Sequence, residues 1–262
     1  MTTEQELNVN RDLAAQWFLR GEGIEIGALH KPLLMPPAAR VTYVDRMSAE
    51  GLRTHYPELK DLPLVDPEII DDGETLSRME AASQDFVVAC HFFEHCQNPV
   101  ITLRNFVRVL KPDGVLFLVV PDKLYTFDKE RPSTTIEHIV RDFEEGPAWS
   151  REDHYREYAR LVDHAPAGEV ETARVQLLMD MDYSIHFHVW TKGEMLELLY
   201  ALKDKYAFGY EVRFFLDNGI EGIYILQKVT EPGNPVRLMG NGTVPGQVTP
   251  EDARGPFWSR RA

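Results

Sequence analysis

The sequence has little cysteine, no long apolar run and no excess of positive charge. Its 262 residues contain only two cysteines, Cys90 and Cys96, which argues against a disulfide framework and is typical of a reducing compartment. No apolar run approaches the ~20 residues that a membrane-spanning helix needs. Residues 1–21 carry acids where a secretory signal requires bases. We therefore expect a cytoplasmic protein with no membrane partner.

The charge balance is strongly acidic. There are 28 Lys and Arg residues against 42 Asp and Glu residues, which gives a formal net charge of -14 at pH 7. No basic cluster interrupts this excess, so the phosphate backbone of a nucleic acid is disfavoured as a partner. The length is sufficient for one large α/β domain with a sizeable core.

Residues 85–121 organise the rest of the chain. Residues 86–90 form a short apolar run with β-branched side chains, which predicts a buried strand. Asn98 can cap a helix that begins at Pro99 and has apolar residues at helical spacing. Residues 115–120 are almost continuously apolar, as in a strand that is covered on both faces. The strand, the helix and the second strand together predict a parallel strand–helix–strand unit. Sheets built from such units bind ligands at the carboxyl ends of their strands.

A chemically reactive group follows the first strand of this unit. It contains His91, Glu94 and His95. If a helix begins near His91, the three side chains face one side of a turn. Two imidazoles and a carboxylate in that arrangement predict a divalent-metal site.

The first part of the core contains a nucleotide-binding signal. Residues 24–26 predict a short strand, and Gly27 follows where the backbone turns or lets a ligand approach. Residues 41–46 predict a second strand, which ends near Asp45. An acid about 20 residues beyond the first strand often binds ribose hydroxyls in open α/β folds.

Taken in order, these motifs resemble the class I S-adenosylmethionine-dependent methyltransferases. The resemblance rests on Glu-Ile-Gly at 25–27, Asp45, Asp85, Glu94-His95 and Val-Leu-Lys-Pro-Asp-Gly at 109–114. It is closest to the subgroup with a Glu-His pair after the fourth strand. It implies a doubly wound α/β fold with a mostly parallel Rossmann-like sheet, an antiparallel last strand and, here, a helical insertion before the closing strands.

The resemblance also implies roles for individual residues around S-adenosylmethionine. Glu25 would hold the methionine amino group, usually through water, and Gly27 would admit the cofactor to the backbone. Asp45 would bind both ribose hydroxyls. Asp72, in preference to Asp71, would accept a hydrogen bond from the adenine amino group. His91 would lie beside the methyl group.

A second resemblance concerns the metal. The segment from His91 to His95 is similar to the Glu-x-x-Glu-His cluster of small-RNA ribose methyltransferases and ubiquinone-pathway O-methyltransferases, with His91 in place of the first Glu. This implies Mg²⁺ or Mn²⁺ bound by His91, Glu94 and His95, with His186 or His188 completing the set. The alternative is a Glu-His pair that only packs, as in metal-free relatives.

We divide the chain into five segments. Residues 1–20 predict a helix with Leu13, Trp17 and Phe18 on its apolar side. The other segments are a cofactor-binding core at 21–122, a helical lid at 123–190, a closing helix and strands at 191–229 and a Pro- and Gly-rich irregular tail at 230–262. Thr191 and Glu194 form a capping-box signature that predicts the start of the closing helix.

The lid holds five of the nine histidines and several aromatic residues. Aromatic and hydrogen-bonding side chains together suit a sugar or another polyhydroxylated acceptor. The alternative is that the segment forms the surface of a homodimer. As general base we consider four histidines: His91, His95, His154 and His188.

The sequence therefore predicts an O-methyltransferase that acts on a sugar hydroxyl of a glycan, glycolipid or glycosylated metabolite. Three alternatives remain open. They are N- or C-methylation of a small metabolite, a non-catalytic binding module on the same fold, and RNA methylation, which the net charge opposes. The sequence does not identify the acceptor, the methylated atom, the metal or the oligomeric state.

Overall fold

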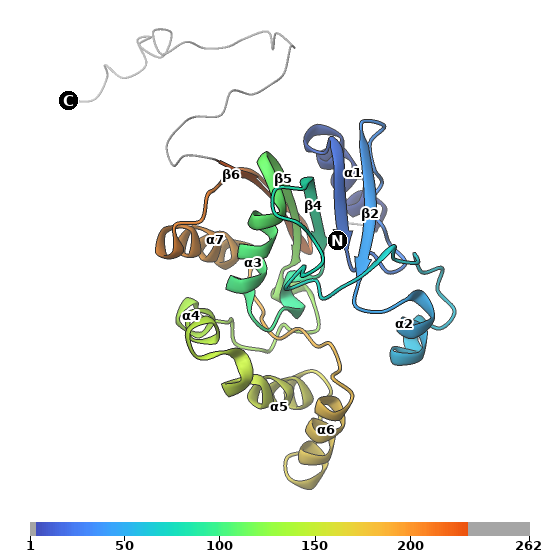
Figure 1. Cartoon of the computed structure of the whole chain (residues 1–262). Helices are drawn as coiled ribbons and strands as arrows, with labels where there is room; N and C mark the ends of the chain where they lie inside the picture. The colour runs from blue at the N-terminus through green and yellow to red at the C-terminus, as the bar shows by residue number, and fades with distance from the viewer. Residues whose placement is uncertain (1–3, 230–262) are drawn as a thin grey trace, which may run out of the picture. The chain divides into compact units, whose positions relative to one another are not determined.

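Seven strands form one sheet in the order β3-β2-β1-β4-β5-β7-β6 (Figure 1). Strands β1 to β5 are parallel, whereas β7 runs antiparallel to both of its neighbours. This arrangement is the predicted fold class. The strands are β1 (Gly21–Ile26), β2 (Ala39–Asp45), β3 (Ile69–Ile70), β4 (Gln84–Cys90), β5 (Leu110–Pro121), β6 (Tyr210–Asn218) and β7 (Glu221–Lys228).

A computed structural model describes residues 4–229 of the chain. The predicted tail at 230–262 lies outside the described residues. Within them, no helix is long and apolar enough to cross a membrane. The helices are α1 (Glu4–Phe18), α2 (Ala49–His55), α3 (Pro99–Val109), α4 (Ile136–Glu145), α5 (Arg151–Leu161), α6 (Glu169–Asp180) and α7 (Lys192–Tyr206).

Local capping signals fix where two of the core helices begin. Asn98 precedes α3, and its side chain accepts a hydrogen bond from the Ile101 amide. Thr191 and Glu194 form a reciprocal capping box at the start of α7. Both caps satisfy amides that have no partner within the helix, which confirms the predicted starts.

The two faces of the sheet are covered unequally. Helices α3 and α7 pack on one face, where their apolar side chains form the larger core with β1, β4 and β5. Helix α1 packs on the other face, where Ala14, Ala15 and Leu19 meet β4, β5 and β7. The predicted apolar side of α1 is wrong for Leu13 and Trp17, which are 43% and 62% exposed. Small alanines allow the helix to approach the sheet more closely than Trp17 would.

The connection from β1 to β2 contains no helix. Residues 27–38 cross as an irregular segment, although the two strands are parallel neighbours. A helix is the usual crossover between such strands. Here α1, which precedes β1 in the chain, packs on that face of the sheet.

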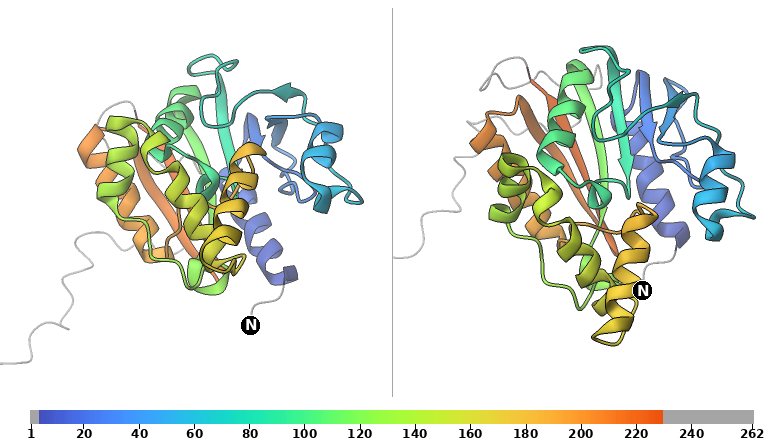
Figure 2. Two further views of the ribbon diagram at one scale, coloured as in Figure 1. Left: turned by 90° about the horizontal axis from the view of Figure 1, so that it is seen from below. Right: turned by 60° about the horizontal axis from the view of Figure 1, so that its bottom comes forward.

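Helices α4, α5 and α6 lie at the carboxyl ends of the parallel strands (Figures 1 and 2). Helices α5 and α6 have a small core of their own, built around Tyr155, Val175 and Phe187. Helix α4 joins the larger core through Ile139. The segment that the sequence assigns to a lid is therefore helical and lies where this type of sheet binds ligands.

Candidate functional site

One cavity of about 480 Å³ opens at the carboxyl ends of the parallel strands. Its volume is within the usual range for a small-molecule site. The ends of β1, β2 and β4 and the turn after β3 form one side of its lining. Segment 182–187, which connects α6 to α7, forms the other side together with Phe127 and Tyr158. The cavity therefore joins the core of the sheet to the helical insertion.

Four residues of the predicted cofactor set line this cavity, namely Gly27, Asp45, Asp72 and His91. Gly27 follows β1 with a φ of 65°, a conformation that favours glycine. Asp45 lies at the end of β2, and burial raises its pKa. Asp72 lines the cavity, whereas the neighbouring Asp71 points away and binds Ser77 and the Arg78 amide. Of the two acids considered for adenine, Asp72 is therefore the one that faces the cavity.

Glu25 does not line the cavity. Its two carboxylate oxygens accept hydrogen bonds from the Leu33 amide at 3.0 and 3.2 Å. It is almost fully buried, and burial raises its pKa to about 7. These bonds hold the irregular segment that follows β1.

His91 adopts a different geometry from the one predicted. Its φ of 51° is left-handed, so the residue forms a turn and does not begin a helix. The short 3₁₀ helix that follows covers only Phe93–His95. The Nε2 atom of His91 lies 2.7 Å from Glu221 Oε2 and 3.1 Å from Arg11 Nη2. The His91 ring still lines the cavity, but it is held by residues from the two ends of the chain.

Arg11 and Glu221 form an ion pair beneath His91 that the sequence analysis missed. The Glu221 side chain is fully buried, and that of Arg11 is 14% exposed. Burial would raise the pKa of Glu221, but hydrogen bonds from His91 and Arg11 outweigh it and lower the pKa to about 2. Asn218 also donates to the same carboxylate. Helix α1 is thereby fixed to the start of β7.

Two histidines meet on the insertion side of the cavity. His95 and His186 lie with their ring centroids 4.7 Å apart. The Nδ1 atom of His95 is 2.9 Å from the Ile185 carbonyl oxygen, which can only accept, so His95 carries its proton there. Burial lowers the pKa of His95 to about 3, which keeps the ring neutral. Its Nε2 atom therefore has a lone pair.

His186 is oriented by Asp128, a residue that the sequence analysis did not single out. His186 Nδ1 lies 2.6 Å from Asp128 Oδ2, and Arg131 holds the other oxygen of Asp128 at 2.8 Å. Arg131 also donates to the His186 carbonyl at 2.7 Å. These bonds fix the ring and leave its Nε2 atom as an acceptor. An oriented Asp-His pair of this kind can take a proton from a hydroxyl group.

The predicted metal set is only partly brought together. Glu94, His95 and His186 offer ligand atoms within 4.8 Å of one another, whereas His91 is not in this group. Both carboxylate oxygens of Glu94 are buried without a hydrogen-bond partner, and burial raises its pKa. The Glu94 oxygen nearest His186 Nε2 is 3.9 Å away. His91 Nδ1 lies 3.9 Å from Glu94 Oε1, while His91 Nε2 is held by Arg11 and Glu221, so the predicted inclusion of His91 in the metal set stays a prediction.

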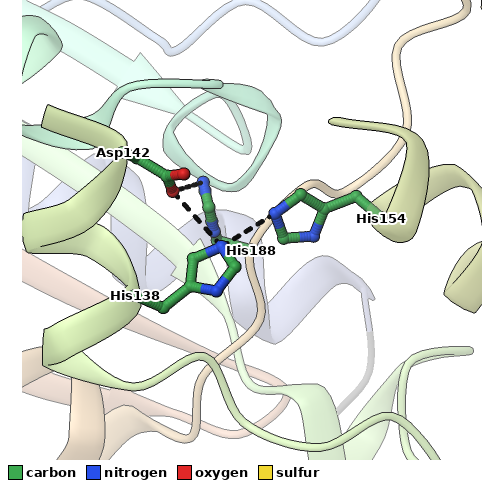
Figure 3. A group of neighbouring side chains, drawn as sticks. All are labelled: His138, Asp142, His154 and His188. Carbon is green, nitrogen blue, oxygen red and sulfur yellow. Dashed lines mark hydrogen bonds and ion pairs between the residues drawn. The ribbon is translucent and has the colours of Figure 1, made fainter. Parts of the chain in front are cut away.

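The structure also removes two of the four candidate bases from the cavity. His154 and His188 do not line it and meet His138 and Asp142 in a separate buried group (Figure 3). His188 likewise takes no part in the group around Glu94. His186 and His188 point in different directions. The side chain of His186 faces the cavity, whereas that of His188 packs beside α4 and Trp190.

Comparison with known proteins supports a methyltransferase. Residues 21–118 match the family model described as "Methyltransferase domain", which covers less than half of the chain. No curated protein sequence matches the chain.

Several solved structures are similar to this one at low identity and low TM-score. A SAM-dependent methyltransferase from Aquifex aeolicus is 12% identical, with 87% of this chain and 94% of that one covered and a TM-score of 0.44. A Rhodobacter sphaeroides protein, described as a zinc-dependent alcohol dehydrogenase, is 14% identical, with 87% and 91% covered and a TM-score of 0.48. The CurJ carbon methyltransferase is 12% identical, with 81% and 49% covered and a TM-score of 0.42. This chain thus spans about half of the CurJ structure, and such low scores say nothing about activity.

The family match falls on the parallel part of the sheet. Residues 21–118, which contain strands β1 to β4 and most of β5, are similar to a methyltransferase domain. The cavity at the carboxyl ends of its strands is the candidate active site.

Proposed function

We propose that this methyltransferase transfers the methyl group of S-adenosylmethionine to a hydroxyl oxygen of a sugar-like acceptor. The observation that carries the proposal is the composition of the cavity at the carboxyl ends of the strands. Two acids that suit a nucleoside, Asp45 and Asp72, line its sheet side. Two imidazoles whose Nδ1 atoms are held by oxygen atoms, His95 and His186, line its insertion side.

The sheet side would hold the donor. A carboxylate at the end of β2 can accept hydrogen bonds from both hydroxyls of a ribose. Asp72 can accept a hydrogen bond from the adenine amino group, and Gly27 leaves room for the methionine part beside β1. His91 would then lie close to the reactive methyl group.

The insertion side would supply the proton acceptor. In the transfer, the acceptor oxygen bonds to the methyl carbon, the carbon–sulfur bond breaks, and the sulfur leaves as a neutral thioether. His186 Nε2 would take the hydroxyl proton, since Asp128 holds the opposite ring nitrogen and stabilises the protonated ring. His95 is the alternative acceptor, but only a backbone carbonyl and the Ser184 hydroxyl support its ring.

Glu94, His95 and His186 also fit a divalent cation such as Mg²⁺ or Mn²⁺. The orphaned oxygens of buried Glu94 and the free Nε2 atoms of both rings form a donor set of suitable type. A cation there would stabilise the negative charge that develops on the acceptor oxygen. In that case Asp128 would orient His186 as a metal ligand, and His186 would not act as the general base.

Aromatic rings suggest a sugar-like acceptor. Phe127 lies with its ring 4.8 Å from that of His186, and Tyr158 stands edge-on to Phe127. Tyr183 completes this wall of the cavity. Phe127 is 54% exposed although it lines a cavity, so an acceptor larger than the cavity can rest against its ring.

The first experiment is calorimetric titration of the full chain with S-adenosylhomocysteine. One-to-one binding at micromolar or lower Kd is expected, with loss of at least tenfold in affinity for Asp45→Ala. The exposed Asp61→Ala variant is the matched control and should bind as the parent does. Absence of binding by the parent chain would overturn the donor assignment.

Acceptor chemistry needs a second measurement. Incubation with S-adenosylmethionine and a set of glycosides, with and without Mg²⁺ or Mn²⁺, should give products heavier by one methylene in mass spectrometry. Stability of the new group to base, together with resistance of the methylated diol to periodate cleavage, would mark a methyl ether on a sugar hydroxyl. Transfer to amines but to no hydroxyl would refute the proposed acceptor while leaving donor binding intact.

A further inference from the structure

A second polar group lies in the insertion, apart from the cavity. It consists of His138 and Asp142 on α4, His154 on α5 and His188 in the segment before α7. Figure 3 shows the four side chains converging from these three parts of the chain. Neither the family match nor the proposed methyl transfer gives them a role.

The contact distances are those of ligands around a common ion. His138 Nε2 is 3.0 Å from His154 Nε2 and 3.3 Å from Asp142 Oδ2, which is 3.5 Å from His188 Nε2. Metal–ligand bonds of about 2.0–2.1 Å place tetrahedral ligands about 3.3 Å apart. All four ligand atoms lie within 4.8 Å of one another.

Hydrogen bonding inside the group does not satisfy its members. Asp142 Oδ2 and His188 Nε2 are buried and have no hydrogen-bond partner among residues 4–229. The Asp142 and His188 side chains are 0% and 1% exposed, so water does not solvate them. Buried polar atoms of this kind are costly unless something else compensates them. A cation at the centre would be a partner for all four residues at once.

The surroundings are also those of a metal site. Ser150 donates to the second oxygen of Asp142 at 2.8 Å, which turns Oδ2 toward the histidines. Such an outer hydrogen bond commonly orients a ligating carboxylate. Three imidazoles and one carboxylate favour a transition ion over Mg²⁺ or Ca²⁺, which prefer oxygen ligands.

We propose that His138, Asp142, His154 and His188 bind one divalent transition-metal ion, Zn²⁺ in the first instance, in a closed four-ligand site. With every position taken by protein, the ion has a structural role. It ties α4 and α5 to segment 184–188, which also lines the cavity through His186. The backbone amide of His188 donates to the Glu94 carbonyl, so the ion would also fix the insertion to the turn after β4.

Metal content of the purified full chain tests the proposal. The protein is stripped with a chelator, loaded with Zn²⁺, dialysed, and measured by elemental analysis. Asp142→Asn and His138→Gln should each bind one equivalent less than the parent. His138 is the most exposed ligand, at 25%, so its variant is the least disturbing to the fold, which circular dichroism checks. His138→Cys, which supplies a thiolate ligand, should retain the equivalent.

The second cluster provides the matched control. Glu94→Gln removes the carboxylate of the group formed by Glu94, His95 and His186, and this variant should keep the equivalent of Zn²⁺ that Asp142→Asn loses. Co²⁺ in place of Zn²⁺ should give the intense visible absorption of a four-coordinate ion in the parent and not in Asp142→Asn. The proposal is overturned if the parent binds no metal, if Asp142→Asn and His138→Gln bind as much as the parent, or if only Glu94→Gln lowers the content.

Discussion

The ion pair between Arg11 and Glu221 links the first helix to the last strand and makes a quantitative prediction about stability. We consider Glu221→Gln, which preserves the size of the side chain and removes its charge. In the parent, the carboxylate accepts from Arg11, Asn218 and His91 while its side chain is fully buried. The variant should therefore unfold more readily at neutral pH.

The magnitude follows from the pKa of Glu221. Its value of about 2 in the folded chain lies below the ordinary 4.5, and this gap corresponds to about 3 kcal/mol of stability at pH 7. Because the folded pKa is the lower one, this stabilisation is present above pH 4.5 and is lost as the pH falls from 4.5 toward 2. At pH 3 only about 1 kcal/mol should remain.

Urea unfolding of both chains at pH 7 and pH 3 measures this. The difference in unfolding free energy should be about 3 kcal/mol at pH 7 and about 1 kcal/mol at pH 3, with an unchanged dependence on urea. The control is Glu211→Gln, which breaks a half-exposed pair with Lys203 and should cost less than about 1 kcal/mol. The reasoning would be refuted if the parent and Glu221→Gln differed in unfolding free energy by the same amount at both pH values, or by less than about 1 kcal/mol at pH 7.

Three further predictions concern the cavity and its walls. Asp128→Asn should lower kcat by about 10²-fold, since it removes the support of His186, and should leave the Kd for S-adenosylhomocysteine within about twofold in calorimetry; an equal loss in both would mean a general structural role. Gly73→Ala should weaken that binding about tenfold, because an added Cβ would lie 2.5 Å from the Phe92 ring; parent-like affinity would contradict this contact. Glu25 has a folded pKa of about 7 against an ordinary 4.5, so its ionisation destabilises the folded chain as the pH rises from 4.5 through 7. In thermal unfolding, Glu25→Gln should therefore gain stability relative to the parent between pH 5 and pH 8. A difference in stability that does not change with pH would contradict the raised pKa of Glu25.

Short-range patterns account for most of the fold prediction. The apolar run at 86–90, the Asn98 cap and the apolar spacing of α3 are properties of neighbouring residues, and each predicted the element that is found. The capping box at Thr191 did the same for α7. The predicted side of α1 failed because two alanines, and not the larger Trp17, face the sheet. Hydrophobicity alone does not show which side can approach most closely.

Some residues of the candidate site were predicted from the sequence, and others were found only in the structure. Gly27, Asp45 and Asp72 follow successive strands, so parallel pairing brings them to one cavity, as predicted from the order of the motifs. The spacing of His138 and Asp142, four apart on a helix, was also readable as a shared face.

The sequence by itself determined where the main strands and helices of the core lie and at which end of the sheet the candidate site was expected. Only the tertiary structure decided which histidines act together. Asp128 pairs with His186 across the insertion, and Arg11 reaches Glu221 from the other end of the chain. Such pairings depend on how distant segments pack, because an imidazole takes its orientation and its proton from its neighbours in space, and no local spacing in the sequence records them.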